Sequence, residues 1–137
     1  MPNPYSILLS LHVVTAILGL GQVVGLGVLA STARAEPPAA VVETLRRLAR
    51  GTAWAALIML LSGAGIEYAV GGAYHDSRWF RGSVLLLVAI GALNGSTRRI
   101  LRNWESSARP LQRVARNAWL MALLVAAAAV LMELKPG

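Results

Sequence analysis

The sequence alternates between long apolar segments and shorter polar ones. The first apolar segment, residues 5–30, contains no charged side chain. It is longer than the roughly 20 residues that a helix needs to cross the hydrocarbon core of a bilayer. Three further apolar segments cover residues 52–72, 82–101 and 117–134. The pattern therefore predicts an all-α protein with four membrane-spanning helices.

The polar segment after the first span still has a helical pattern. Pro37 and Pro38 end the preceding helix, and apolar residues then recur at helical spacing over residues 38–50, with charged residues on the other faces. This pattern predicts an amphipathic helix that lies at the membrane surface or leads into the second span. The connections are short enough to favour an up-down-up-down bundle, with residues 1–137 as a single transmembrane domain.

The first span has one alternative interpretation, a cleaved signal peptide. Residues 32–35 have the small-residue pattern of a cleavage site. However, no Lys or Arg precedes the apolar segment, and the segment is longer than the roughly 7–15 apolar residues of a signal peptide. We therefore expect the first segment to remain as a membrane span.

The composition agrees with a membrane protein. Apolar residues make up 56% of the chain and charged residues 14%, against roughly 25% charged residues in soluble domains. The chain has no cysteine, which excludes disulfides, thiolate metal sites and cysteine nucleophiles. Hydrolase, phosphate-loop and metalloprotease motifs are also missing.

The basic residues predict how the spans are oriented. The net charge is +7, and most of the basic residues lie in the first and third connections: Arg34, Arg46, Arg47, Arg50, Arg98, Arg99, Arg102, Arg109, Arg113 and Arg116. The positive-inside rule then places both termini on the extracytoplasmic side of the membrane. We expect these arginines to bind anionic lipid headgroups rather than nucleic acid.

Polar residues and glycines divide the first span into two faces. His12, Thr15 and Gln22 share one face at helical spacing, and polar side chains at this depth are expected to face a protein interior. Gly21 and Gly25 lie on roughly the opposite face as a small-xxx-small pair. This pair predicts close packing against a second helix or a second protomer.

Two later spans each contain one polar residue that needs a partner. Glu67 lies in the second span and Asn94 in the third. In adjacent antiparallel helices His12 and Glu67 would have similar depths, so we predict a hydrogen bond or ion pair between them. His12, Gln22, Glu67 and Asn94 together would then form a buried polar clasp between the helices.

The role of this clasp has several interpretations. It could be purely structural, or it could relay protons. His12 could be an axial ligand of a haem b, with His75 as the second ligand or with none. His12 and Glu67 could also bind a metal such as copper, with His75 or Asp76 as a further ligand.

The first helix carries the features of a known group of proteins. A histidine within residues 11–14, LHVV, followed by Gly19, Gly21 and Gly25, resembles small bacterial four-helix membrane proteins of unknown function. These are related to the copper-resistance D-like and protoporphyrinogen-oxidase J-like proteins. The resemblance implies that His12 takes part in haem or copper handling. The chain departs from the haem-enzyme pattern, since no later span contains a second histidine or a lysine.

Two classes of function follow. The first is a non-enzymatic structural or accessory membrane protein, either a homo-oligomer or a subunit of a larger membrane complex. The second is a haem- or copper-binding membrane protein with His12 as a ligand.

Overall fold

A computed structural model describes residues 3–73 and 76–134. Four long helices account for most of these residues: α1 (Pro4–Thr32), α2 (Ala39–Ala69), α3 (Arg78–Arg102) and α4 (Pro110–Leu134). A short 3₁₀ helix, η1 (Trp104–Ser106), lies between α3 and α4. Each of the four long helices is long and apolar enough to cross a membrane. The predicted all-α class with four candidate spans is confirmed.

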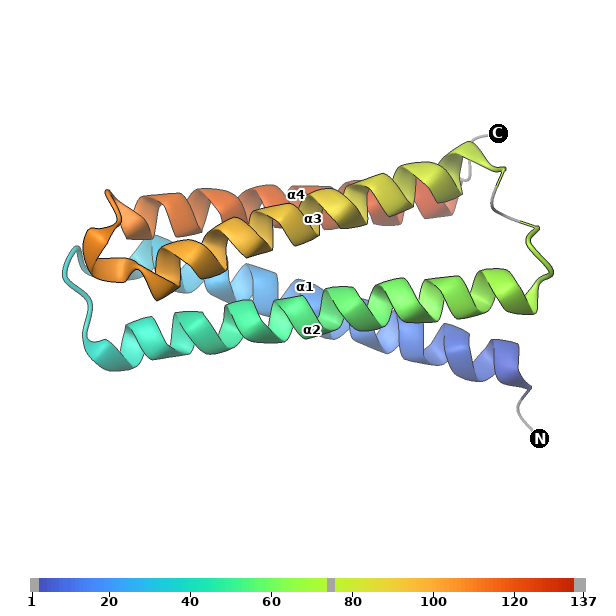
Figure 1. The fold of residues 1–137 in the computed structure, drawn as a ribbon, viewed down its shortest axis with the longest axis horizontal. Coiled ribbons are helices and arrows are strands. Elements are labelled where there is room, and N and C mark those ends of the chain that lie inside the picture. Colours follow the sequence, from blue (N-terminus) through green and yellow to red (C-terminus); the bar gives the residue numbers. More distant parts are fainter. Residues whose placement is uncertain (1–2, 74–75, 135–137) are drawn as a thin grey trace.

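The helices form an up-down-up-down bundle (Figure 1). Neighbouring pairs are α1–α2, α2–α3, α3–α4 and α1–α4. The α1–α2 and α3–α4 connections lie together at one end, which we call the basic end because the ten arginines predicted to face the cytoplasm lie there or in the adjoining helical turns (Figure 1). The start of α1, the α2–α3 connection and the end of α4 lie at the opposite end, the far end.

The boundaries of α1 follow from its flanking residues. The side chain of Asn3 accepts a hydrogen bond from the backbone N–H of Ser6 at 2.8 Å, and Pro4 occupies the first turn. Both features are typical of a helix N-terminus. The helix ends at Thr32, before Pro37 and Pro38, so it extends slightly beyond the predicted span at both ends.

The predicted amphipathic segment and the predicted second span are one continuous helix, α2. Nothing between them stops a helix, because Gly51 is tolerated inside one and proline is absent there. With 31 residues α2 is about 46 Å long, so its first turns extend past a hydrocarbon core of about 30 Å. It ends at Ala69, before Gly71 and Gly72, whose φ angles of 69° and 79° stop the helix earlier than residue 72.

The last two helices also begin earlier than their apolar segments. α3 begins at Arg78 rather than at residue 82, and α4 begins at Pro110 rather than at residue 117. Charged residues do not end a helix, so each helix continues from its span into the polar region until a turn interrupts it. Before α4 that turn contains Arg109, with a φ of 49°.

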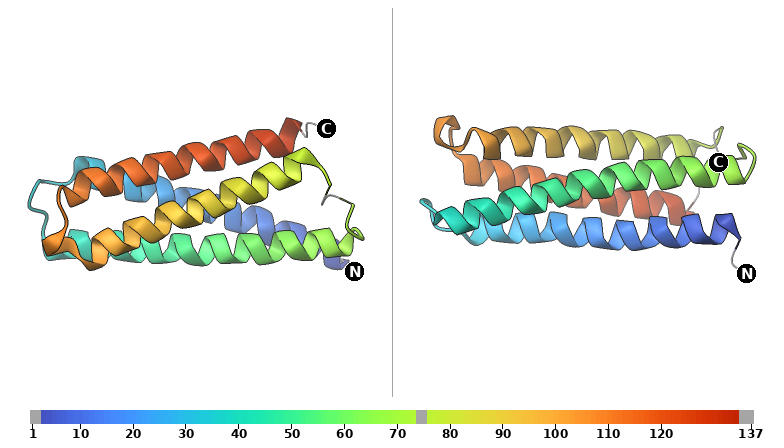
Figure 2. Two further views of the ribbon diagram at one scale, coloured as in Figure 1. Left: turned by 45° about the horizontal axis from the view of Figure 1, so that its top comes forward. Right: turned by 60° about the horizontal axis from the view of Figure 1, so that its bottom comes forward.

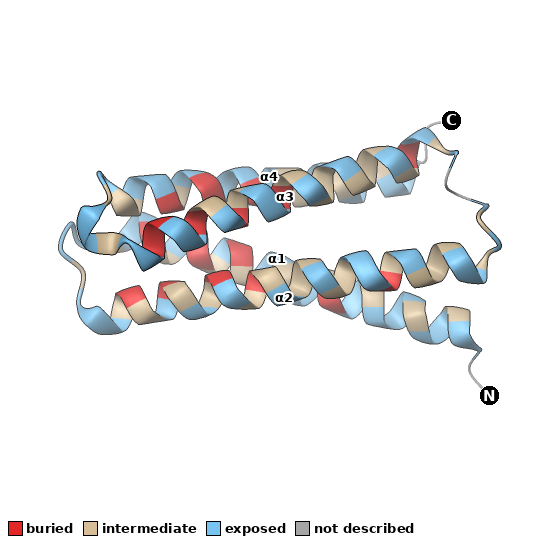
Figure 3. Ribbon diagram, viewed as in Figure 1, coloured by how far each residue is buried: buried red, intermediate tan, exposed pale blue. Residues whose placement is uncertain are grey.

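Burial is concentrated toward the basic end (Figure 3). The two further views show that all four helices run the full length of the bundle (Figure 2). The apolar core nevertheless comes largely from the turns nearer the basic end: Val23, Leu26, Ala30, Leu45, Ala49, Ile90, Ile100, Leu101, Val114, Ala118 and Met121. Among the described residues of the half nearer the far end, the buried ones are Thr15, Ser62 and Trp79. The helices are therefore packed less completely toward the far end.

Candidate functional site

His12 lies on α1 and forms a hydrogen bond with α2. Its Nδ1 atom is 2.8 Å from Oγ of Ser62, and the Ser62 hydroxyl donates to the backbone carbonyl of Met59 at 3.2 Å. A hydroxyl has one proton, so a Ser62 that donates to Met59 accepts its second bond from Nδ1–H of His12. In this tautomer Nε2 of His12 carries the lone pair.

Ser62 takes the place that we predicted for Glu67. The two residues are five positions apart on α2, which is about 7.5 Å along the helix axis. A partner on the second span was predicted correctly, but the residue that bonds to His12 is Ser62. Glu67 lies half-buried in the last turns of α2, closer to the far end than Ser62. Ser62 is buried, with a relative exposure of 3%.

Asn94 and Gln22 lie at a different depth from His12. Asn94 on α3 is 2% exposed, and its Nδ2 donates to the carbonyl of Ala49 on α2 at 3.0 Å. Gln22 on α1 lies against Gly51, where a Cβ atom would come within 2.5 Å of its Nε2. Ala49 and Ser62 are about 20 Å apart along α2. The four predicted clasp residues therefore do not form one cluster.

Three interhelical contacts were not predicted from the sequence. Nδ2 of Asn117 donates to Oγ1 of Thr97 at 3.2 Å, between α4 and α3. Nε1 of Trp119 donates to Oγ of Ser31 at 3.0 Å, between α4 and α1. Nε and Nη2 of Arg46 on α2 donate to the carbonyl of Leu101 on α3, at 3.1 and 2.9 Å. Asn117 was recognisable only as the first residue of the fourth apolar segment, and Trp119 only as an interfacial aromatic residue.

The predicted glycine pair does not bring two helices of this chain together. A Cβ atom at Gly21 would meet nothing within 4 Å, and one at Gly25 would meet only the Leu48 side chain at 3.9 Å. The close approaches on α1 occur at Gly19, 3.1 Å from the Ala55 Cβ, and at Gly27, 2.9 Å from the Trp119 ring. Packing against a second protomer through Gly21 and Gly25 stays a prediction.

The predicted haem and metal ligands are only partly described by the structure. His75 lies outside the described residues. Within residues 3–73 and 76–134, no group of three or more His, Asp and Glu residues lies close enough to hold a metal ion. Within the described part of the chain, His12 is the one histidine, and Ser62 holds its ring in place. This donor set fits one axial position of a haem, whereas a copper site would need further ligands.

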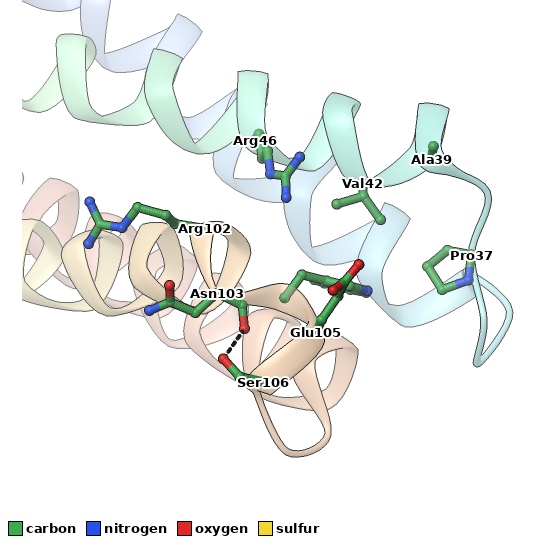
Figure 4. A pocket seen from close by; sticks show the side chains of 9 residues that line it. Pro37, Ala39, Val42, Arg46, Arg102, Asn103, Glu105 and Ser106 are labelled. Carbon is green, nitrogen blue, oxygen red and sulfur yellow. Dashed lines mark hydrogen bonds between the residues drawn. The ribbon is translucent and has the colours of Figure 1, made fainter.

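A cavity of about 660 Å³ opens at the basic end, between the start of α2 and the end of α3 (Figure 4). Arg46 and Glu105 point toward its centre, while the Arg102 side chain extends away from it (Figure 4). The Arg46 guanidinium already bonds to the Leu101 carbonyl. The cavity is lined by the acidic side chain of Glu105, and its Arg46 is already hydrogen-bonded to Leu101. These charges do not favour the binding of an anion.

The chain was compared with known protein families, with curated proteins and with solved structures. None of the three comparisons found a match. The proposal for its function therefore rests on the contacts of its own residues.

Proposed function

We propose that this chain is a non-catalytic, multi-pass protein of a bacterial inner membrane with a structural or accessory role. One observation carries the proposal: each neighbouring pair of helices is joined by at least one interhelical hydrogen bond from a polar side chain. Polar side chains in membrane helices often mark a ligand site, but they also hold helices together. Here His12, Asn94, Asn117 and Trp119 hold helices together through their hydrogen bonds.

The His12–Ser62 pair has the spacing of a catalytic base and its nucleophile, so an enzyme deserves comparison. A serine nucleophile must reach a substrate and needs hydrogen-bond donors for the oxyanion that forms. Ser62 is 3% exposed, and its hydroxyl donates to the carbonyl of Met59, an acceptor that cannot stabilise an oxyanion. These contacts support a structural pair. A fluorophosphonate probe should accordingly leave Ser62 unlabelled in the folded protein, and labelling would contradict the proposal.

The orientation that we propose puts the basic end in the cytoplasm. The ten arginines gathered there support it through the positive-inside rule. Their exposed side chains, such as Arg47, Arg98 and Arg99, would bind anionic lipid headgroups.

A pair of reporter fusions tests this orientation. Alkaline phosphatase, which is active only outside the cytoplasm, should be active when fused after Gly137 and inactive when fused after Ser107, between η1 and α4. The opposite pair of activities would overturn the orientation.

The geometry of His12 supports a second candidate, a haem protein with a single axial histidine. Ser62 fixes the imidazole through Nδ1 and leaves the Nε2 lone pair available, which is how a second residue commonly orients a ligand histidine. The visible absorption spectrum of the purified protein separates the two candidates.

The structural proposal predicts a protein with no Soret band and no stoichiometric copper by elemental analysis. A Soret band in the wild-type protein that is lost in His12→Ala would replace it with the haem candidate. Ser62→Ala is the matched control, because it removes the orienting hydroxyl but keeps the ligand nitrogen. In a haem protein it would shift the band and not abolish it.

A further inference from the structure

Two amide oxygens in the bundle accept no hydrogen bond from the described residues. They are Oδ1 of Asn94 on α3 and Oε1 of Gln22 on α1, and both atoms are buried. A buried carbonyl oxygen that lacks a donor loses the hydrogen bonds it had in water, so such atoms are rare in folded proteins. The loss matters more in a lipid-covered bundle, because lipid offers no donor either.

The two oxygens belong to one layer of the bundle. Asn94 donates to Ala49 of α2, and the Gln22 amide lies against Gly51, two residues farther along the same helix. Gln22 is 18 residues from the start of α1 and Asn94 is 16 residues from the start of α3, about 27 and 24 Å from the far end. At the basic end, Gln22 is 10 residues from the end of α1 and Asn94 is 8 residues from the end of α3, about 15 and 12 Å, so the layer lies inside the bundle and away from both ends.

The orientation of the Asn94 amide is determined by its partner. The Ala49 carbonyl can only accept a hydrogen bond, so Nδ2 of Asn94 must face it and Oδ1 must face the other way. Turning the amide over would place two oxygens against each other. Exchanging the amide nitrogen and oxygen of Asn94 therefore does not supply the missing donor.

We propose that this layer binds internal water, which donates to Oδ1 of Asn94 and to Oε1 of Gln22. A buried water molecule needs two to four polar partners. The two oxygens accept from it, and the Gln22 amide also carries a donor, Nε2. The inference does not depend on the proposed function, since either a structural protein or a haem protein could contain this layer.

Water fits the layer better than a metal cation. Both oxygens are neutral amide oxygens, and the acidic residues of the chain are Glu36, Glu43, Glu67, Asp76, Glu105 and Glu133. All six lie outside the layer, so a cation there would have no counter-charge. The ten arginines at the basic end would raise its energy further.

Water-edited solid-state NMR of the full chain in lipid bilayers tests the proposal. Magnetisation should pass from water to Cγ of Asn94 and Cδ of Gln22 several-fold faster than to the side-chain carbons of Met121 and Leu26, which are fully buried in the apolar core. Transfer to the two amides as slow as to Met121 would overturn the proposal. Amide signals that shift with sodium or potassium concentration would also overturn it, in favour of a cation.

A variant localises the water. Asn94→Leu removes one of the two acceptors, so transfer to Cδ of Gln22 should fall several-fold. Thr97→Ser, one turn along the same helix and with the hydroxyl retained, is the control and should leave the transfer to Gln22 unchanged. Unchanged transfer to Gln22 in Asn94→Leu would show that the two amides do not share a hydrated layer. The wild-type measurement needs no variant to fold.

Discussion

The indole ring of Trp119 packs against α1 at a position that has no side chain. A Cβ atom at Gly27 would lie 2.9 Å from Cε2 of Trp119, too close for an unstrained contact. The same ring donates from Nε1 to Ser31, one turn farther along α1. Gly27 therefore allows the approach that positions the indole for its hydrogen bond between α4 and α1.

Replacing Gly27 by alanine should disturb this contact. The added methyl group must displace the indole ring, which the Nε1–Ser31 hydrogen bond holds against the same helix. Gly21→Ala on the same helix is the matched control, because a Cβ there meets nothing within 4 Å. We expect Gly27→Ala to be less stable than Gly21→Ala by about 1–3 kcal/mol. Unfolding of both variants in detergent titrations measures the difference, and equal stabilities would contradict the packing described here.

Single-residue contacts were the least predictable from the sequence. The depth estimate that paired His12 with Glu67 was uncertain by more than one helical turn, and Ser62 lies within that margin. Serine in a membrane helix commonly bonds to its own backbone, so the sequence does not mark it as a partner. The glycine spacing likewise identified close packing on α1 but selected Gly21 and Gly25, whereas the structure uses Gly27.

At the scale of helices, Arg46 joins the beginning of α2 to the end of α3. The Leu101 carbonyl belongs to the last turn of α3, where carbonyl groups lack partners within the helix. The Arg46 guanidinium donates two hydrogen bonds to it and places a positive charge near the negative end of the helix dipole. Arg46 therefore acts as a cap supplied by a neighbouring helix.

Removing this cap should destabilise the bundle. We expect Arg46→Gln to lower the free energy of unfolding by about 1–2 kcal/mol, because glutamine cannot supply the same pair of charged hydrogen bonds. The adjacent Arg47 is the control: its side chain is 75% exposed and faces only Glu43, at 3.5 Å. Arg47→Gln should change the unfolding free energy by no more than about 0.5 kcal/mol. Equal losses of unfolding free energy in Arg46→Gln and Arg47→Gln would contradict the capping role.

The centres of the helices could be predicted, but their ends could not. Apolar length identifies the part of each helix that is apolar enough to cross lipid, and the structure has four helices that are also long enough to do so. It does not show where a helix stops, because charged residues continue α2, α3 and α4 outside the apolar segments. The helix boundaries lie at turns with proline, glycine or a positive φ angle. Examples are Pro38 before α2, Gly71 after α2 and Arg109 before α4.

In the whole molecule, the uneven core divides the bundle into two halves. The fully buried residues Leu26, Leu45, Val114 and Met121 belong to the half near the basic end. Toward the far end, His12 and Ser62 form a hydrogen bond between α1 and α2. The two halves should therefore differ in local stability.

Hydrogen exchange measures this difference directly. Amides in the turns around Leu45 and Val114 should exchange more slowly than amides around Ile66 and Val84, because opening of the packed half disrupts more buried contacts. Peptides from both halves should be followed in one detergent preparation, so that the surrounding medium is matched. A uniform rate along the helices, or faster exchange near the basic end, would contradict the division.

The topology of the whole molecule was the most predictable feature. Short connections between four apolar segments favour an up-down-up-down bundle, and the structure confirms that arrangement. The uneven core could not be predicted, because it depends on which side chains face inward at each turn. The proposed orientation in the membrane still rests on the arginine distribution.

The central claim is that polar side chains hold these helices together, and the His12–Ser62 pair tests it most directly. Unfolding free energies of the wild type, His12→Ala, Ser62→Ala and the double variant give the coupling energy of the pair. Interhelical hydrogen bonds in membrane proteins contribute about 0.6 kcal/mol on average and up to about 1.7 kcal/mol. We predict a favourable coupling of about 1 kcal/mol, with the double variant little worse than either single one. Strictly additive losses, with no coupling, would contradict the account.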